Sequence, residues 1–431
     1  MPFVGCIADD FTGATDLANN LVREGLRAVQ IIGVPSAADM AGLDAADAVI
    51  IALKTRTVPV DEAVAQSRAA LEALKVAGCQ RFFFKYCSTF DSTPEGNIGP
   101  VAEALLADLG EAMAIAAPAF PANGRTVLNG ELFVDGVPLN ESGMQNHPLT
   151  PMTDSNLVRW LGTQCRGEVG LIDHQTIDAG VEAIRDRAAD LGEVGVTLAI
   201  VDGKDEQQLR VVGEAFADAR LITGGSGIAM GLPAPWRAAG QIEARADAGG
   251  LAEFNGATAV ISGSCSVRTR EQVAAFADCH PSLGLDPLAI ADNPEGAVAE
   301  ALAWAEPKLS DGPVLIYSTD SPDAVLAAQS RLGSAEAGAL IERALAQISL
   351  GLVDAGVRRL IVAGGETSGA VVSTLGIQVL RIGPQIDPGV PWTGARLSRG
   401  ADAPPIDLAL ALKSGNFGGV DFFTRAFEVC P

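Results

Sequence analysis

The fold class follows from one stretch near the start of the chain, Phe3-Val4-Gly5-Cys6-Ile7-Ala8-Asp9-Asp10-Phe11-Thr12-Gly13-Ala14-Thr15-Asp16. Its apolar first half predicts a buried β-strand, and the small residues that follow the two carboxylates predict a turn into a helix. In open α/β sheets, ligands bind at the carboxyl ends of the strands, beside such turns. The opening stretch therefore predicts an α/β fold with Asp9 and Asp10 at the ligand-binding edge of a sheet.

The same alternation of apolar runs and helical stretches continues through both halves of the chain, which is typical of βαβ units. The runs predict strands at 3–8, 48–53, 82–84, 113–117, 170–172 and 197–201, and then at 257–261, 314–317, 360–363, 379–382 and 407–412. Two segments differ. The alternation from Arg125 to Leu139, around Asp135-Gly136, predicts a β-hairpin, and the glycine- and proline-rich stretch from Gly383 to Gly400 predicts a surface loop.

The length of the chain predicts two domains, because 431 residues exceed the size at which one hydrophobic core stops growing. Residues 233–255 contain Pro-Ala-Pro and Gly-Gly and lack a strand-like run, so they predict a linker. We therefore expect an N-terminal domain over 1–232 and a C-terminal domain over 256–431. Both should be α/β domains with mainly parallel sheets, with a ligand cleft between them.

The composition excludes several classes of function. Thirty basic against 53 acidic residues give a net charge of -23, which disfavours nucleic acid and anionic membranes as partners. The chain has no run of about 18 apolar residues that would span a bilayer. Its seven cysteines are scattered singly, without a CxxC pair, and its start lacks the basic region of a signal peptide. These features predict reduced thiols in a cytoplasmic protein.

The two carboxylates after the first strand are candidates for acid–base chemistry. One could accept a proton from a substrate hydroxyl while the other orients a hydroxyl or a metal. The alternative is that Asp9 or Asp10 caps the following helix, a common role of aspartate. Two consecutive carboxylates exceed what a cap needs, so the pair predicts a functional site.

Basic and polar residues follow two further strands of the first half. Arg56 could hold a carboxylate with its guanidinium fork, and Lys85 would act as a point charge. Either could instead be a solvated surface charge. The polar segment 86–99 follows Lys85, and its Ser88 and Asp91 could line a pocket for a hydroxylated molecule. The alternative for this segment is a plain loop that caps the next helix.

The second half carries glycine-rich turns at three strand ends. Gly364-Gly365-Glu366-Thr367-Ser368-Gly369 follows one strand, Ser262-Gly263-Ser264 another, and Lys413-Ser414-Gly415-Asn416-Phe417-Gly418-Gly419 a third. Such turns let backbone N–H groups and a helix dipole face a phosphate, although tight turns also use glycine for steric reasons. The chain has no GxxxxGK[ST] loop and no regular GxGxxG fingerprint, which disfavours an NAD-dependent dehydrogenase.

Taken together, the motifs at 9–14, 85–99, 364–369 and 413–418 resemble the four-carbon acid sugar kinase family, formerly a domain of unknown function, over nearly the whole chain. The resemblance implies that the N-terminal domain binds an acid sugar, that the C-terminal domain binds ATP, and that phosphate passes to the terminal hydroxyl with Mg²⁺ on the phosphates. The loop from Lys85 to Asn97 is similar to that of the 3-oxo-tetronate kinase branch. Glu95 stands where the threonate branch carries arginine.

The resemblance also implies roles for individual residues. Catalysis is expected from Asp10 and Asp9, with Asp10 preferred as the base because usually only one of two adjacent strand residues faces the site. The expected acid-sugar contacts are Arg56, Lys85, Ser88 and Asp91. The expected ATP contacts are Ser262, Ser264, Gly364, Gly365, Glu366, Thr367 and Gly415, and the sequence indicates no metal ligands.

The predicted partners are therefore a small acid sugar and ATP, without nucleic acid or membrane, in a chain that could form a homodimer. The predicted reaction is ATP-dependent phosphorylation of 3-oxo-tetronate at its 4-hydroxyl, giving 3-dehydrotetronate 4-phosphate. Two alternatives stay open from the sequence. One is a kinase of D-threonate or D-erythronate, and the other is a sensor that binds ATP and an acid sugar without reaction.

Overall fold

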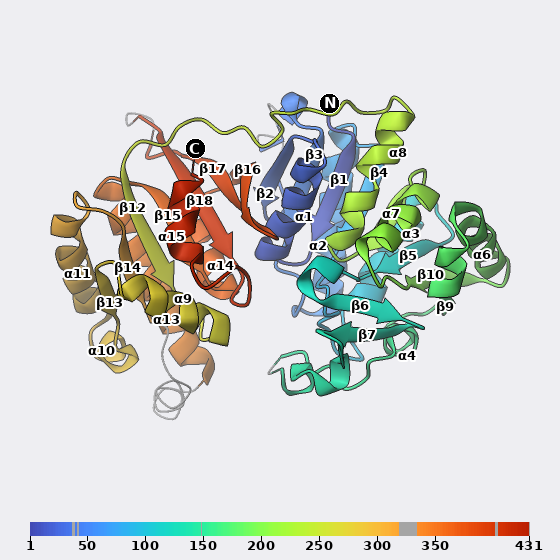
Figure 1. The fold of residues 1–431 in the computed structure, drawn as a ribbon, viewed down its shortest axis with the longest axis horizontal. Coiled ribbons are helices and arrows are strands. Elements are labelled where there is room, and N and C mark those ends of the chain that lie inside the picture. The colour runs from blue at the N-terminus through green and yellow to red at the C-terminus, as the bar shows by residue number, and fades with distance from the viewer. Residues whose placement is uncertain (37–38, 41–42, 148, 319–333, 401–403, 431) are drawn as a thin grey trace. The chain divides into compact units, whose positions relative to one another are not determined.

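The computed structural model describes residues 1–36, 39–40, 43–147, 149–318, 334–400 and 404–430. The chain divides into two compact units, Met1–Ala248 and Gly249–Pro431 (Figure 1). Each unit is an α/β structure with a mainly parallel sheet, so the predicted fold class is confirmed. The first unit runs past residue 232 because helix α8 (Pro233–Ala238) packs on it, with Trp236 buried against Phe3. Part of the predicted linker is therefore a helix of the first unit.

The sheet of the first unit is parallel throughout. In sheet order its strands are β2 (Ala28–Ile32), β3 (Ala48–Ala52), β1 (Val4–Ala8), β4 (Arg81–Lys85), β11 (Leu221–Gly224), β5 (Ala114–Ala117), β10 (Val196–Val201) and β9 (Glu168–Ile172). Every residue of β1 and β3 is buried. Continuous apolar strands of this kind are typical of a parallel sheet that is covered on both faces.

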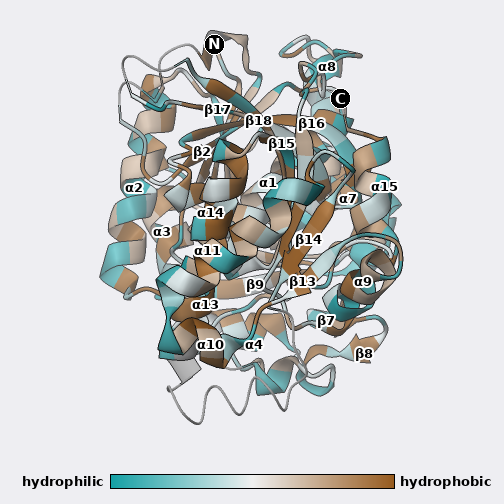
Figure 2. Cartoon of the chain, turned by 90° about the vertical axis from the view of Figure 1, so that its left-hand side faces the viewer, coloured by the Kyte–Doolittle hydropathy of each residue, from teal (hydrophilic) through white to brown (hydrophobic). Residues whose placement is uncertain are grey.

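Helices connect these strands. They are α1 (Phe11–Arg23), α2 (Val60–Val76), α3 (Ile98–Leu109), α4 (Leu157–Gly162), α5 (His174–Asp178), α6 (Val181–Glu193) and α7 (Glu206–Ala215). In Figure 2 α2 carries both hydrophobic and hydrophilic colour, as expected of a helix with one face on the core. Within the described ranges, no helix is long and apolar enough to span a membrane.

The strand order changes direction at β1. The chain places β2 and β3 on one side of β1 and then crosses to β4 on the other side. The register pairs Ala8 of β1 with Ala52 of β3 and with Lys85 of β4. The residues that follow β1, β3 and β4 therefore lie at one edge, at the point where open α/β sheets bind ligands.

A small antiparallel ribbon, β6 (Arg125–Leu128), β7 (Glu131–Val134) and β8 (Val137–Pro138), lies where the sequence predicts a hairpin. It has two tight turns instead of one, at Asn129-Gly130 and at Asp135-Gly136. Asp202, which follows β10 and is fully buried, holds the first turn. Its carboxylate accepts hydrogen bonds from the backbone N–H of Asn129, Gly130 and His174 at 2.6–2.9 Å.

The sheet of the second unit is parallel over five strands and antiparallel at one side. In sheet order the strands are β13 (Ser282–Gly284), β14 (Val314–Tyr317), β12 (Ala257–Ser262), β15 (Val357–Ala363), β18 (Ile406–Lys413), β17 (Val390–Leu397) and β16 (Val379–Asp387). The helices are α9 (Val267–Ala277), α10 (Pro287–Asp292), α11 (Pro294–Ala305), α13 (Ser334–Asp354), α14 (Gly365–Thr374) and α15 (Phe422–Glu428).

The prediction of a surface loop from Gly383 to Gly400 is wrong. The segment forms most of β16 and all of β17, and Trp392 in β17 is fully buried. Only Pro388-Gly389 is a turn, since Asp387 pairs with Val390 on either side of it. Gly383 is there for packing, because a Cβ on it would lie 2.2 Å from the Leu251 side chain. Glycine and proline therefore serve here as strand residues as well as turn residues.

The anchoring of the ribbon by Asp202 gives a prediction about stability. Asp202→Ala leaves three N–H groups without their acceptor, of which that of Gly130 is buried, so we expect the free energy of unfolding of the first unit to fall by about 3 kcal/mol. Asp205→Ala is the matched control, because the Asp205 carboxylate caps α7 by accepting one N–H, from Gln208. It should lower the stability by about 1 kcal/mol. Urea unfolding measures both, and equal losses in the two variants would contradict the anchoring role.

Candidate active site

The carboxylate of Asp10 caps helix α1. One of its oxygens, Oδ2, accepts hydrogen bonds from the Gly13 N–H at 3.1 Å and from the Thr12 hydroxyl at 2.9 Å. This is the arrangement that the sequence left open as the alternative for one of the two aspartates. The other oxygen, Oδ1, contacts Arg56. Asp10 therefore combines a capping role with membership in a charged cluster.

Arg56, which follows β3, joins both aspartates. Its Nε and Nη2 each donate a hydrogen bond of 2.8 Å to Asp9, and Nη2 also donates one of 2.7 Å to Asp10. Its Nη1 lies 3.8 Å from Oδ2 of Asp91 in the loop after β4. The sequence suggests that this fork could hold a ligand carboxylate. In the structure the fork holds Asp9, and this ion pair links the ends of β1 and β3.

The surroundings separate the acidities of the two aspartates. Burial raises the pKa of Asp9, and the Arg56 guanidinium opposes the increase. Burial would also raise the pKa of Asp10, but Arg56, Lys85 and the hydrogen bonds from Thr12 and Gly13 outweigh it and lower the pKa to about 2. Asp10 is therefore ionised at neutral pH and is a weak base.

Lys85 supplies a buried positive charge at the end of β4. Its side chain is 3% exposed, and Nζ donates a hydrogen bond of 2.7 Å to the carbonyl of Tyr86. The ammonium lies beside the first turn of α1, since a Cβ on Gly13 would be 2.9 Å from Nζ. Glycine at this position therefore makes room for both the lysine and the Asp10 carboxylate, to which a Cβ would be closer still, at 2.2 Å from Oδ1. The structure thus places Asp9, Asp10, Arg56 and Lys85 together, as the sequence predicts from strand ends alone.

The loop after β4 is tightly fixed. The Asp91 carboxylate accepts a hydrogen bond of 2.6 Å from the Thr89 hydroxyl, and Phe90 has a left-handed backbone with φ of 58°. Ser92 holds this turn because its Oγ donates to the Phe90 carbonyl at 2.8 Å and accepts from Trp160 Nε1 at 3.0 Å. Ser88 is half-buried in the same loop. This loop therefore brings Asp91 to Arg56.

The structure adds Asp16 to this edge, a residue that the sequence prediction did not include among the site residues. Asp16 is 6% exposed and lies on α1 one turn beyond Gly13. Its Oδ2 accepts a hydrogen bond from the hydroxyl of Ser226, just after β11. Burial raises the pKa of Asp16 to about 6, although Lys85, Ser226 and Arg125 oppose the increase. The signal in the sequence is its spacing of three from Gly13, which puts both residues on one helix face.

The predicted nucleotide contacts of the second unit follow three neighbouring strands. Ser262 ends β12 and is paired in register with Ala363 of β15, which is itself paired with Lys413 of β18. A Cβ on Gly415 would lie 2.5 Å from Ser264 Oγ, and one on Gly263 would lie 2.3 Å from Thr367 Oγ1. The glycines thus let the three turns meet closely.

The turn after β15 exposes the start of helix α14. Gly364 has a φ of 126°, which favours glycine, and α14 begins at Gly365. Gly365 and Glu366 are exposed in its first turn, whereas Thr367 is buried. Ser262 is fully buried and Ser264 half-buried. The first N–H groups of a helix carry a partial positive charge, so this turn is suited to an anion such as a phosphate.

Lys413 supports the third turn and is the main residue of this unit that the sequence prediction of site residues missed. Its side chain is fully buried, and Nζ donates to the carbonyls of Ser414 at 2.8 Å and Gly415 at 2.9 Å and to the Thr269 hydroxyl at 3.2 Å. The Ser266 hydroxyl also donates to the Gly415 carbonyl, at 2.6 Å. These contacts fix the backbone at Gly415.

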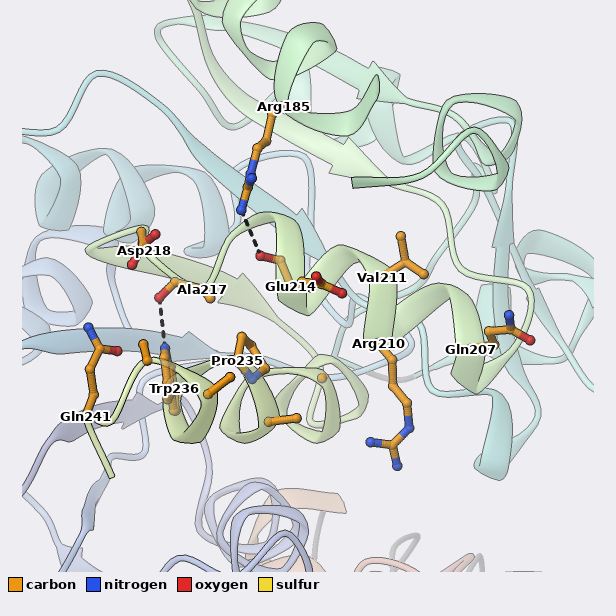
Figure 3. Close-up of a pocket in the computed structure, with 14 residues that line it drawn as sticks. Arg185, Gln207, Arg210, Val211, Glu214, Ala217, Asp218, Pro235, Trp236 and Gln241 are labelled. Atoms are coloured by element: carbon orange, nitrogen blue, oxygen red, sulfur yellow. Dashed lines mark hydrogen bonds between the residues drawn. The ribbon is translucent and has the colours of Figure 1, made fainter. Parts of the chain in front are cut away.

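A cavity of about 590 Å³ lies between α7 and α8 (Figure 3). Arg185, Arg210, Trp236 and Gln241 are among the residues that line it. Trp236 packs on Phe3, just before β1, so this cavity lies toward the amino ends of the strands. Because ligands of open α/β sheets bind at the carboxyl ends, we do not assign the active site to it.

Metal-ligand clusters are absent from the described ranges, where no three His, Cys, Asp or Glu side chains gather closely enough to hold an ion. Mg²⁺ in kinases is commonly held by substrate phosphates with one or two carboxylates. The arrangement is compatible with that mode, with the exposed carboxylate of Glu366 at the start of α14 as a candidate ligand.

The burial of Lys413 gives a prediction about pH. Burial lowers its pKa from 10.5 to about 7, and Arg268 adds to the decrease. Between these two values the unfolded chain binds a proton that the folded chain has released, so stability should rise with pH. We expect the free energy of unfolding of the second unit to rise by about 1 kcal/mol per pH unit from pH 7 to 9, relative to Lys413→Met. Urea unfolding of both proteins at the two pH values measures the difference, and parallel pH dependence would contradict it.

Comparisons with known proteins cover both units. Residues 4–232 match the model of a sugar-binding N-terminal domain, and residues 259–423 match that of a nucleotide-binding C-terminal domain. The solved structures similar to this chain include one from Salmonella typhimurium LT2, with a TM-score of 0.88 and 44% identity over 99% of both chains. Another, from Haemophilus influenzae, has a TM-score of 0.78 and 43% identity over 99% of both chains.

Curated relatives match over the full length. A 3-oxo-tetronate kinase of Pseudomonas fluorescens is 56% identical over 99% of this chain and 96% of its own. Proteins of the same name from Burkholderia multivorans and Salmonella typhimurium are 56% and 46% identical, over 99% and 98% of this chain and 97% and 98% of their own. The chain therefore belongs to the four-carbon acid sugar kinase family, in which a sugar-binding N-terminal domain precedes a nucleotide-binding C-terminal domain.

Proposed function

We propose that this chain transfers the γ-phosphate of ATP to the 4-hydroxyl of 3-oxo-tetronate and so forms 3-dehydrotetronate 4-phosphate. The observation that carries the proposal is the buried Lys85 ammonium among carboxylates at the ligand-binding edge of the first unit. The names of the full-length relatives supply the acceptor.

The charges at this edge suit an acid sugar. A net charge of -23 repels an anionic substrate at long range, so binding needs a local positive charge. Lys85 provides it, because one hydrogen bond to the Tyr86 carbonyl leaves part of its donor capacity for a substrate carboxylate. Asp10 and Asp91 offer acceptors for hydroxyl groups, and Ser88 offers a hydroxyl of its own. We infer that Arg56 acts by holding Asp9 and Asp10 in place.

The turns of the second unit suit the triphosphate. We propose that the N–H groups at the start of α14 and the loop at Gly415 hold its phosphates, with Ser262, Ser264 and Thr367 around them. Mg²⁺, when bound to the phosphates, neutralises charge that develops during transfer. Phosphoryl transfer depends on positioning and electrostatic stabilisation more than on covalent help from the protein, so these groups would supply most of what the reaction needs.

The test of the function is ATP consumption with defined acceptors. Purified protein with ATP and Mg²⁺ should form ADP with 3-oxo-tetronate and should do so with a higher kcat/KM than with D-threonate or D-erythronate. A coupled ADP assay measures the rate, and mass spectrometry identifies the phosphorylated product. Equal or better turnover of D-threonate would contradict the assignment of 3-oxo-tetronate as the acceptor. Binding of ATP and acid without ADP formation would indicate a sensor.

The role of Lys85 gives a second prediction. Lys85→Met removes the buried charge and keeps an unbranched side chain that is one atom shorter, so we expect KM for the acid sugar to rise about 10- to 100-fold. KM for ATP should change little, because the predicted nucleotide contacts lie in the second unit. Lys75→Met is the control, since Lys75 lies near the end of α2 and pairs with Glu72. Steady-state kinetics in which each substrate is varied in turn measures both KM values. An unchanged KM for the acid sugar would rule out a contact between Lys85 and that substrate.

A further inference from the structure

Asp16 carries a buried carboxylate to which the proposed function assigns no role. Its side chain faces the segment after β11, where Ser226 donates a hydrogen bond to Oδ2. Its other oxygen, Oδ1, is also buried and accepts no hydrogen bond from the described part of the chain. A buried carboxylate oxygen without a partner is unfavourable, so this atom needs a donor from outside the described chain, such as a water molecule or a ligand hydroxyl.

The neighbouring aspartates differ from Asp16 in this respect. Both oxygens of Asp9 accept hydrogen bonds from Arg56. Both oxygens of Asp10 also have donors, Arg56 on one side and Thr12 and Gly13 on the other. At this edge of the sheet, Asp16 thus offers an oxygen that is still open to a ligand.

Charged groups from three elements surround Asp16. They are Lys85 at the end of β4 and Arg125 of β6, which favour its ionised form, and Asp10 at the start of α1, which opposes it. Arg125 Nε and Asn123 Nδ2 are buried donors that bond to no acceptor within the described ranges. The Arg125 side chain, with its unpartnered Nε, and the Asp16 side chain, with its unpartnered oxygen, thus interact electrostatically, and recognition of a hydroxylated acid requires both a donor and an acceptor.

We propose that Asp16 is the catalytic base, accepting the proton of the acid-sugar hydroxyl that is phosphorylated. This inference rests on the proposed function. It moves the base from Asp10, which the sequence favoured, to a carboxylate with an open oxygen. In this scheme Asp10 caps α1 and keeps Arg56 in place.

In the proposed step the acid-sugar hydroxyl is the nucleophile. The hydroxyl O–H bond breaks and its proton passes to Asp16 Oδ1, while the hydroxyl oxygen uses an electron pair to bond to the γ-phosphorus of ATP. The bond between that phosphorus and the bridging oxygen breaks, and ADP leaves with that pair. Asp16 then releases the proton to water. A carboxylate with a pKa of about 6 is ionised at neutral pH and is a better base than Asp10.

A purely structural role is the competing explanation. Asp16 joins α1 to the segment after β11, and Asn20 makes a second such contact by donating to the Ser226 carbonyl at 3.0 Å. The two contacts lie one helical turn apart, so Asn20→Ala weakens the same contact between elements without removing a carboxylate. It is the matched control for Asp16→Asn, which keeps an acceptor for Ser226 but cannot take a proton.

The experiment compares the wild type, Asp16→Asn, Asn20→Ala and Ser226→Ala as full-length chains. Asp16→Asn should lower kcat with 3-oxo-tetronate at least about 100-fold and leave acid-sugar affinity, measured by calorimetry, within a few-fold. The wild-type kcat should fall as pH drops through about 6, and the residual rate of Asp16→Asn should lack this decrease. Ser226→Ala should move the decrease to higher pH, because the Ser226 hydrogen bond lowers the pKa of Asp16.

The outcomes separate the inference from the proposed function. A wild type that forms no ADP with any of the three acids overturns both. If the wild type is active and Asp16→Asn keeps both the wild-type kcat and its decrease below about pH 6, the inference alone is overturned. Equal losses in Asp16→Asn and Asn20→Ala would assign Asp16 a structural role. If circular dichroism shows that Asp16→Asn does not fold, the pH dependence of kcat in Ser226→Ala is the deciding measurement. A decrease of kcat at the same pH as in the wild type then overturns the inference.

Discussion

The register of β1 against β3 and β4 is the constraint on which the candidate acid-sugar site depends. Ala8 pairs with both Ala52 and Lys85, so the residues that follow these strands meet at the same height of the sheet. Asp9 and Arg56 then form a bidentate ion pair in which the Asp9 side chain is buried and the Arg56 side chain is half-buried. A buried ion pair contributes little net stability, but breaking it is strongly unfavourable. Its main effect here is to fix the position of the carboxylates relative to Lys85.

The two units use buried lysines in similar ways. Lys85 and Lys413 each end a parallel strand, and each donates to the carbonyl of the residue that follows it. The difference lies in the charges around them. Lys85 lies among carboxylates, whereas the acceptors of Lys413 are neutral and burial lowers its pKa to about 7. Lys85 is therefore suited to hold an anion, and Lys413 is suited to shape the backbone of a turn.

Sequence reasoning identified those residues of the candidate site that local pattern places at strand ends. Asp9, Asp10, Arg56 and Lys85 each follow an apolar run, and strand ends of a parallel sheet meet at one edge. It did not determine the partners of these side chains, because the Arg56 fork depends on the register of strands far apart in the sequence.

The errors of the sequence-based prediction also arise where tertiary structure, and not local pattern, determines the outcome. The sequence does not predict strand β11 (Leu221–Gly224), because its short apolar run ends in glycines. It predicts Gly383 to be a loop residue, although Gly383 lies in a strand and makes room for Leu251. In both places tertiary packing gives glycine a role that no local pattern reveals.

Helix α1 shows how such a site affects the stability of the fold. Its buried face includes Thr15, Asp16, Asn19 and Asn20 as well as apolar residues. Apolar side chains at these positions would pack with less unfavourable desolvation, so stability alone does not explain the polar ones. Polar groups that violate local rules for folding concentrate at functional sites, where the rest of the core offsets their effect on stability. The fully buried strands β1 and β3, on which this helix packs, provide that core.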